Sequence, residues 1–81
     1  MKQITTIAKI TATKKLNNSV NGNPAYEVRL ETANNVMYGR TAPDAMCAYV
    51  LNLEYTYNAE VTYHLTRSGK LYIDYIIRTN Q

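Results

Sequence analysis

Hydrophobic and polar residues alternate with a period of two along most of the chain, which is typical of half-buried β-strands. The first alternating stretch, residues 3–16, is rich in Ile and Thr, and we expect it to form one long strand. One face of this strand carries Thr6, Ala8, Ile10 and Ala12. Residues 17–24 follow as a cluster of turn-forming residues, so a connecting loop is predicted there.

A second strand and a third strand are predicted on either side of a short turn. Tyr26, Val28 and Leu30 alternate with charged residues, and residues 36–41 begin after Asn34-Asn35. Asn tolerates the left-handed backbone conformation that a tight turn requires. Strands 26–31 and 36–41 are therefore expected to pair as an antiparallel hairpin.

A helix is predicted after the third strand. Thr41 is placed to accept a hydrogen bond as the cap, Pro43 lies in the first turn, and Asp44 faces the positive end of the helix dipole. The apolar stripe of this helix has the spacing i, i+3, i+4 and i+7, and consists of Met46, Tyr49, Val50 and Leu53. We expect the stripe to pack against the sheet.

The last third of the chain predicts a second hairpin, in which residues 59–66 and 71–78 flank the loop 67–70. In the first of these strands, Val61, Tyr63 and Leu65 share the apolar face. In the second strand the apolar face is predicted to carry Leu71, Ile73, Tyr75 and Ile77, and the outer face Tyr72, Asp74, Ile76 and Arg78. Tyr26, Tyr49, Tyr63 and Tyr75 all fall on apolar faces and are expected to pack in the core.

The predicted order is strand, strand, strand, helix, strand, strand. This is the order of the oligonucleotide/oligosaccharide-binding (OB) barrel, a small partly open barrel of five strands. The fold class is thus mainly β with one helix, as a five-stranded antiparallel small barrel or curved sheet. An SH3-like barrel has nearly the same linear pattern and is the alternative. A long first strand fits the OB-like arrangement, because one strand must curve through both halves of the barrel.

Length and composition limit what the chain can do. With 81 residues, 1–81 is expected to be a single small domain with little room for an enclosed active site. The one cysteine, Cys47, excludes an internal disulfide and a thiolate zinc site. No apolar run has the length of a signal peptide or a membrane span, so a cytoplasmic location without membrane contact is expected.

Catalytic and cofactor-binding patterns are missing from the sequence. His64 is the single histidine and is predicted to be a surface residue rather than a general base, because it lies on the face of its strand opposite the apolar residues. The acidic residues are scattered and the three glycines are far apart, so neither a metal cluster nor a phosphate loop can be recognised. We expect a binding protein without cofactor or metal, and not an enzyme.

Exposed tyrosines beside basic residues are the strongest candidates for a binding surface, since such pairs stack and hold single-stranded nucleic acid. The formal charge of +3 permits this ligand without requiring it. The candidate patch is Tyr38, Arg40, Arg67, Lys70, Tyr72 and Arg78. A second candidate surface is the loop from Lys14 to Asn23, which begins with Lys14 and Lys15.

Three segments have a recognisable layout: residues 16–28, which contain the sequence SVNGNP, then Thr41–Tyr49, and then residues 64–70, which contain Thr-Arg-Ser-Gly. In these segments the sequence resembles small uncharacterised proteins of bacteria, phages and mobile elements. The resemblance implies a phage or mobile-element protein that acts in the cytoplasm of a bacterial host, and it transfers no catalytic residue.

Two functional hypotheses follow. The first is an inhibitor that blocks a host defence protein or nucleoprotein complex by occlusion, as anti-CRISPR proteins do, either as a monomer or as a homodimer. The second is an OB-like protein that binds single-stranded nucleic acid through the tyrosine and arginine side chains.

Overall fold

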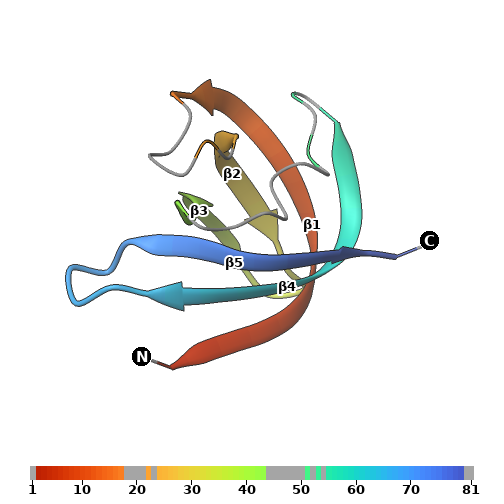
Figure 1. Ribbon diagram of the computed structural model, residues 1–81. Coiled ribbons are helices and arrows are strands. Elements are labelled where there is room, and N and C mark those ends of the chain that lie inside the picture. The colour runs from red at the N-terminus through yellow and green to blue at the C-terminus, as the bar shows by residue number, and fades with distance from the viewer. Residues whose placement is uncertain are drawn as a thin grey trace.

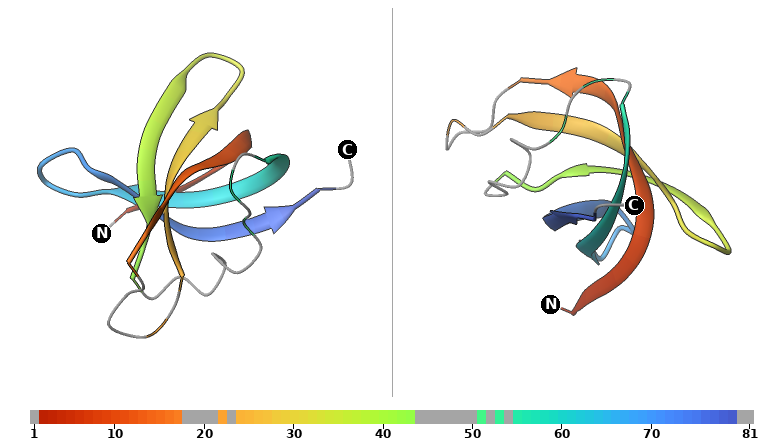
Figure 2. Two further views of the ribbon diagram at one scale, coloured as in Figure 1. Left: turned by 90° about the horizontal axis from the view of Figure 1, so that it is seen from above. Right: turned by 90° about the vertical axis from the view of Figure 1, so that its right-hand side faces the viewer.

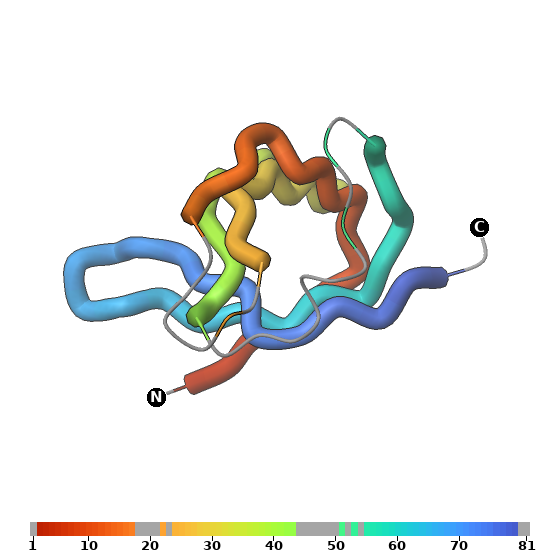
Figure 3. The backbone as a smooth tube through the Cα atoms, turned by 45° about the horizontal axis from the view of Figure 1, so that its top comes forward, coloured from red at the N-terminus to blue at the C-terminus, as the bar shows by residue number. Residues whose placement is uncertain are grey.

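The alternating stretch that opens the chain forms a long first strand in the computed structural model, which describes residues 2–17, 22, 24–43, 51, 53 and 55–79. The described strands are β1 (Gln3–Leu16), β2 (Ala25–Glu31), β3 (Val36–Thr41), β4 (Thr56–Leu65) and β5 (Leu71–Arg78). They form one mixed sheet that closes on itself in the order β1, β2, β3, β5, β4 (Figure 1, Figure 3). All five predicted strands are therefore confirmed.

Strand β1 belongs to both halves of the closed sheet. Residues 3–11 pair with β4 and residues 9–16 pair with β2, both antiparallel. Ala8, Ile10 and Ala12, which the alternation places on one face, are buried. A bulge between Ala12 and Lys14 adds to the bend of the strand, and Figure 2 shows β1 curving around the sheet. One continuous strand thus ties the two halves together.

Both predicted hairpins are confirmed. Strands β2 and β3 pair antiparallel, and the Thr32 amide donates to the Asn35 carbonyl across the turn at 2.8 Å. Strands β4 and β5 also pair antiparallel, and in their loop the Thr66 amide donates to the Lys70 carbonyl at 2.8 Å. Gly69 has a φ of 86° in this loop, a conformation that glycine adopts without strain.

The sheet closes through a parallel seam between β3 and β5. Arg40 pairs with Tyr72 and Thr41 with Ile73, and the Ala42 amide donates to the Ile73 carbonyl at 2.9 Å. The prediction of an all-antiparallel sheet is therefore wrong at this seam. The pairing is not formed by a hairpin, so no turn signal in the sequence indicates it.

The structure describes the two ends of the segment that is predicted to be a helix, and neither end is helical. Thr41 ends strand β3 instead of capping a helix, and its buried Oγ1 accepts a hydrogen bond from the Tyr26 amide at 3.1 Å. Leu53, the last residue of the predicted stripe, forms an isolated parallel bridge with Ala12. Residues 44–50, including Met46, Tyr49 and Val50, lie outside the described residues. In the part of the chain that is described, all regular secondary structure is β and no helix long enough to span a membrane is found.

A bulge in β5 overturns the predicted faces of the second half of that strand. Thr62 pairs with Tyr75 and Tyr63 pairs with Ile73, so Asp74 is an additional residue on β5. Because side chains alternate with a period of two, one added residue exchanges the two faces beyond it. Ile76 is therefore buried, whereas Tyr75 and Ile77 are exposed.

The core fills the interior of the closed sheet. Ile10, Leu30 and Ile73 are its largest fully buried side chains. Tyr63 is buried as predicted, and its hydroxyl donates to the Met37 sulfur at 3.9 Å. Tyr26 packs against the core and is partly buried, while Leu65, predicted to be internal, is exposed at the end of β4.

Candidate functional site

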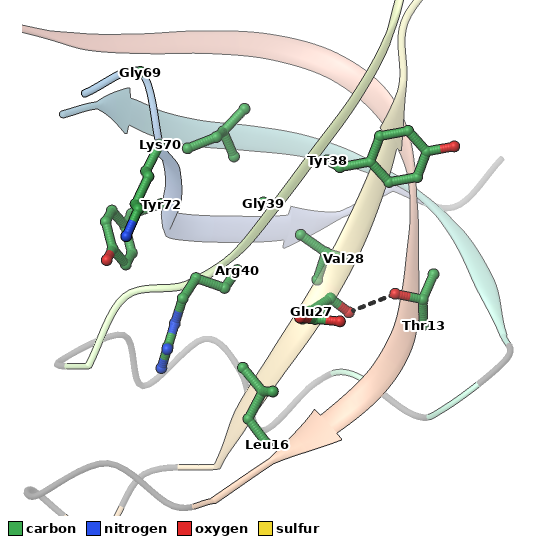
Figure 4. A pocket seen from close by; sticks show the side chains of 11 residues that line it. Thr13, Leu16, Glu27, Val28, Tyr38, Gly39, Arg40, Gly69, Lys70 and Tyr72 are labelled. Atoms are coloured by element: carbon green, nitrogen blue, oxygen red, sulfur yellow. Dashed lines mark hydrogen bonds between the residues drawn. The ribbon is translucent and has the colours of Figure 1, made fainter. Parts of the chain in front are cut away.

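An open groove of about 490 Å³ lies on the outer side of the sheet, where the end of β1, strands β2 and β3, and the hairpin between β4 and β5 meet. Figure 4 shows the side chains around it. The groove is lined by Thr13, Leu16, Glu27, Val28, Tyr38, Gly39, Arg40, Gly69, Lys70, Leu71 and Tyr72. Its rim is polar and aromatic, and Val28 and Leu71 belong to the buried core below it.

The strand register places a continuous row of polar side chains around the outside of the sheet. Residues directly opposite each other on neighbouring strands have side chains on the same face. Following the pairs from β1 through β2, β3, β5 and β4 back to β1, the row is Lys14, Glu27, Arg40, Tyr72, His64 and Gln3. The middle of this row crosses the groove.

Tyr72 is held in place by its neighbours in the row. The Arg40 guanidinium lies 5.9 Å from the centre of the Tyr72 ring, which is within the range of a cation–π interaction. On β4, the His64 ring is stacked with Tyr72, with 5.7 Å between ring centres and 24° between ring planes. The half-buried Tyr72 ring therefore has fixed contacts on two strands.

His64 is itself fixed by Asp74, a pairing that the sequence did not reveal. The His64 Nδ1 lies 2.6 Å from the Asp74 Oδ2, and the two side chains are only 17% and 18% exposed. Gln3 Nε2 donates to the same carboxylate oxygen at 3.3 Å. The prediction of a surface histidine is therefore corrected, because the His64 side chain is largely buried beside Asp74. Both residues lie on the predicted outer faces of one hairpin. The sequence indicates their proximity only through the number of residues that separates each of them from the hairpin loop.

Four of the predicted site residues, Tyr38, Arg40, Lys70 and Tyr72, line the groove together. Lys14 is exposed beside it, directly opposite Glu27. The prediction thus identified both tyrosines and two of the cationic side chains of this site. These residues are far apart in the sequence, because Tyr38 and Arg40 belong to β3 whereas Lys70 and Tyr72 lie at the end of the β4–β5 hairpin.

The other three predicted residues lie elsewhere. Arg67 is exposed in the β4–β5 loop and does not line the groove. The Lys15 ammonium lies 5.4 Å from the centre of the Tyr26 ring. Arg78 sits beyond the bulge, opposite the buried Ala59, and its guanidinium lies 4.0 Å from the centre of the Tyr57 ring. The prediction that Arg78 shares a face with Tyr72 is wrong because the bulge at Asp74 exchanges the faces.

Glu27, Thr13 and Gly39 also line the groove and were not predicted as site residues, whereas Leu16 belongs to the candidate loop from Lys14 to Asn23 and lies at the end of β1. The Thr13 hydroxyl donates to the Glu27 carbonyl at 3.2 Å, which links β1 to β2 at the groove wall (Figure 4). Of the candidate loop from Lys14 to Asn23, residues 18–21 and 23 lie outside the described residues. Among the residues that are described, no three His, Cys, Asp or Glu side chains are grouped so that they could hold a metal ion.

Comparison of the chain with protein-family models, with curated proteins and with solved structures finds no match.

The His64–Asp74 pair can be tested as a unit that supports Tyr72. We expect a double-mutant cycle with His64→Ala and Asp74→Ala to give a coupling energy of about 1 kcal/mol, because the two side chains are largely buried and within hydrogen-bond distance. Urea unfolding of the wild type, both single variants and the double variant measures this value. Strictly additive effects would contradict a direct interaction.

Proposed function

We propose that this domain is an OB-like barrel that binds single-stranded nucleic acid in the groove. The closed strand order supports the OB-like assignment, together with a first strand shared by both halves. The alternative, an SH3-like barrel made only of antiparallel neighbours, is disfavoured by the parallel seam between β3 and β5. OB barrels bind oligonucleotides on the face of strands 2 and 3, between the loops that join strands 1 to 2 and 4 to 5. The groove occupies the corresponding place.

The observation that carries the proposal is the meeting of two tyrosines and two cationic side chains in one groove. Tyr38 is 69% exposed, so its ring is open to stacking by a base. Arg40 and Lys70 lie in the same groove and can contact the phosphates of the strand. With Lys14 at the edge, the groove has three cationic groups and one carboxylate, Glu27, and therefore a positive net charge. None of these roles requires bond breaking, and we propose binding without catalysis.

The salt dependence of binding tests this proposal. In fluorescence-anisotropy titrations we expect single-stranded oligonucleotides to bind more tightly than duplexes, with an affinity that falls as salt rises. Each phosphate contact contributes about 0.7 to the slope of log K against log salt for a single strand, so three cationic groups predict a slope of about −2. Lys70→Ala should reduce the magnitude of the slope by about 0.7.

Lys9→Ala is the matched control, because Lys9 is also exposed but lies outside the groove. It should leave the slope close to that of the wild type. No binding of any single strand, or equal slopes for Lys70→Ala and Lys9→Ala, would overturn the proposal.

A second candidate function is the blocking of a host defence protein or nucleoprotein, which follows from the resemblance to phage proteins. The exposed apolar side chains on the outer face of β1, β4 and β5 favour a protein partner. Ile7, Glu60 and Ile77 form one cross-strand row there, and Thr5, Thr62 and Tyr75 form the next. This surface is separate from the groove, so the oligonucleotide titration distinguishes the two candidates.

A further inference from the structure

Glu27 is an unexpected residue in a groove that binds phosphates. It lies in the middle of the row, with Lys14 opposite it on β1 and Arg40 opposite it on β3. Figure 4 shows its side chain between those of Arg40 and Thr13. A carboxylate at this place repels the backbone of a nucleic acid, so it weakens binding unless it contacts another part of the ligand.

The Glu27 carboxylate makes no ion pair with either neighbour. Among the described residues, the ion pairs are Arg29–Glu31 and His64–Asp74. The Thr13 hydroxyl bonds to the Glu27 backbone carbonyl and leaves both carboxylate oxygens free. Two strong acceptors are therefore exposed in the groove that Tyr38 and Tyr72 also line.

The bases differ in what they can offer to such a carboxylate. Guanine has two adjacent donors, N1–H and the N2 amino group, which match the two oxygens of a carboxylate. In cytosine and adenine the amino group stands beside a ring nitrogen that accepts, and in thymine and uracil the N3–H stands between two carbonyl oxygens. Unpaired bases in single strands present these edges to the protein. Guanine is therefore the one base that can form a bidentate pair with Glu27.

We propose that Glu27 makes the groove selective for single strands that contain guanine, an inference that rests on the proposed function. A guanine stacked in the groove donates both hydrogen bonds to the Glu27 carboxylate, while Arg40 and Lys70 contact the flanking phosphates. The carboxylate thus weakens the binding of the phosphate backbone and at the same time provides recognition of guanine.

The test compares three labelled single-stranded DNA probes by fluorescence anisotropy: alternating thymine–guanine, the same probe with inosine in place of guanine, and oligothymidine. Inosine lacks only the N2 amino group. For the wild type we expect the guanine probe to bind at least about fivefold more tightly than the inosine probe, since a hydrogen bond to a charged group is lost. Equal affinities for these two probes would overturn the inference, and this comparison needs no variant.

Glu27→Gln gives a second, opposite signal. The preference for guanine over inosine should fall below about twofold, while the affinity for oligothymidine should rise because a negative charge has left the groove. Glu60→Gln is the matched control, because Glu60 is exposed on β4 outside the groove, and it should change neither value. Unchanged selectivity in Glu27→Gln would also overturn the inference. Binding of all probes without selectivity refutes only the role of Glu27, whereas no binding of any probe refutes the proposed function itself.

Discussion

Replacing Tyr38 with alanine should weaken the binding of single-stranded oligonucleotides by about tenfold. Stacking of one base on an aromatic side chain contributes about 1–3 kcal/mol, and the Tyr38 ring is the more exposed of the two rings in the groove. Tyr72→Ala should also weaken binding, because it removes the ring that the Arg40 guanidinium contacts. Anisotropy titration at low salt measures both effects.

Tyr75→Ala is the control for Tyr38→Ala. Tyr75 is 62% exposed against 69% for Tyr38, and both lie in strands, so the two truncations should have similar small effects on folding. Tyr75 does not line the groove. Equal losses of affinity in the two variants would show that Tyr38 has no specific role.

Gly39→Ala should destabilise the domain by about 2 kcal/mol, which is the usual cost of overpacking a filled core. A Cβ atom on Gly39 would lie 2.5 Å from the Leu71 carbonyl oxygen and 2.5 Å from the Leu71 Cδ2. The backbone oxygen cannot rotate away, so β3 and β5 would have to separate. The reduced entropy of the unfolded chain, which stabilises a Gly-to-Ala variant by at most about 1 kcal/mol, does not offset this clash.

Thermal unfolding followed by circular dichroism tests the prediction, with an expected decrease in Tm of about 10 °C for a domain of this size. The exposed Lys9→Ala should stay within about 0.5 kcal/mol of the wild type. Because Gly39 lies between Tyr38 and Arg40 in the groove, the folded fraction of Gly39→Ala should also bind oligonucleotides more weakly. A variant as stable as the wild type would mean that the seam tolerates a wider separation.

The parts of the site that the sequence predicts are those fixed by local alternation. Tyr38 and Arg40 are two residues apart in one strand, and Lys70 and Tyr72 are two residues apart at the end of one hairpin. The period of two within a strand places Tyr38 and Arg40 on one face of β3 and Tyr72 on the outer face of β5. Whether the face of β3 with Tyr38 points the same way as Tyr72 does not follow from it. The candidate patch joins these two pairs, but the parallel seam between β3 and β5 that brings them together could not be predicted.

Arg78 and the predicted helix show why local patterns fail. The bulge at Asp74 comes from one added residue that has no distinctive composition, yet it turns Arg78 away from Tyr72 and buries Ile76. Thr41 has the residue type and the neighbours of a helix cap, but it ends β3. Its hydroxyl accepts a hydrogen bond from the Tyr26 amide and its backbone pairs with Ile73, and both contacts hold it in the sheet. In both cases a contact between distant segments overrides the local preference.

By itself, the sequence determined five strands, two hairpins and the residues that share one face of β1, because turns and alternation depend on neighbouring residues. The tertiary structure decided the closure of the sheet, the faces of β5 beyond Asp74 and the position of Glu27 between Lys14 and Arg40. These features depend on which strands become neighbours and in which register. Register across a closed sheet is set by packing of the whole core, and no short segment of the chain contains that information.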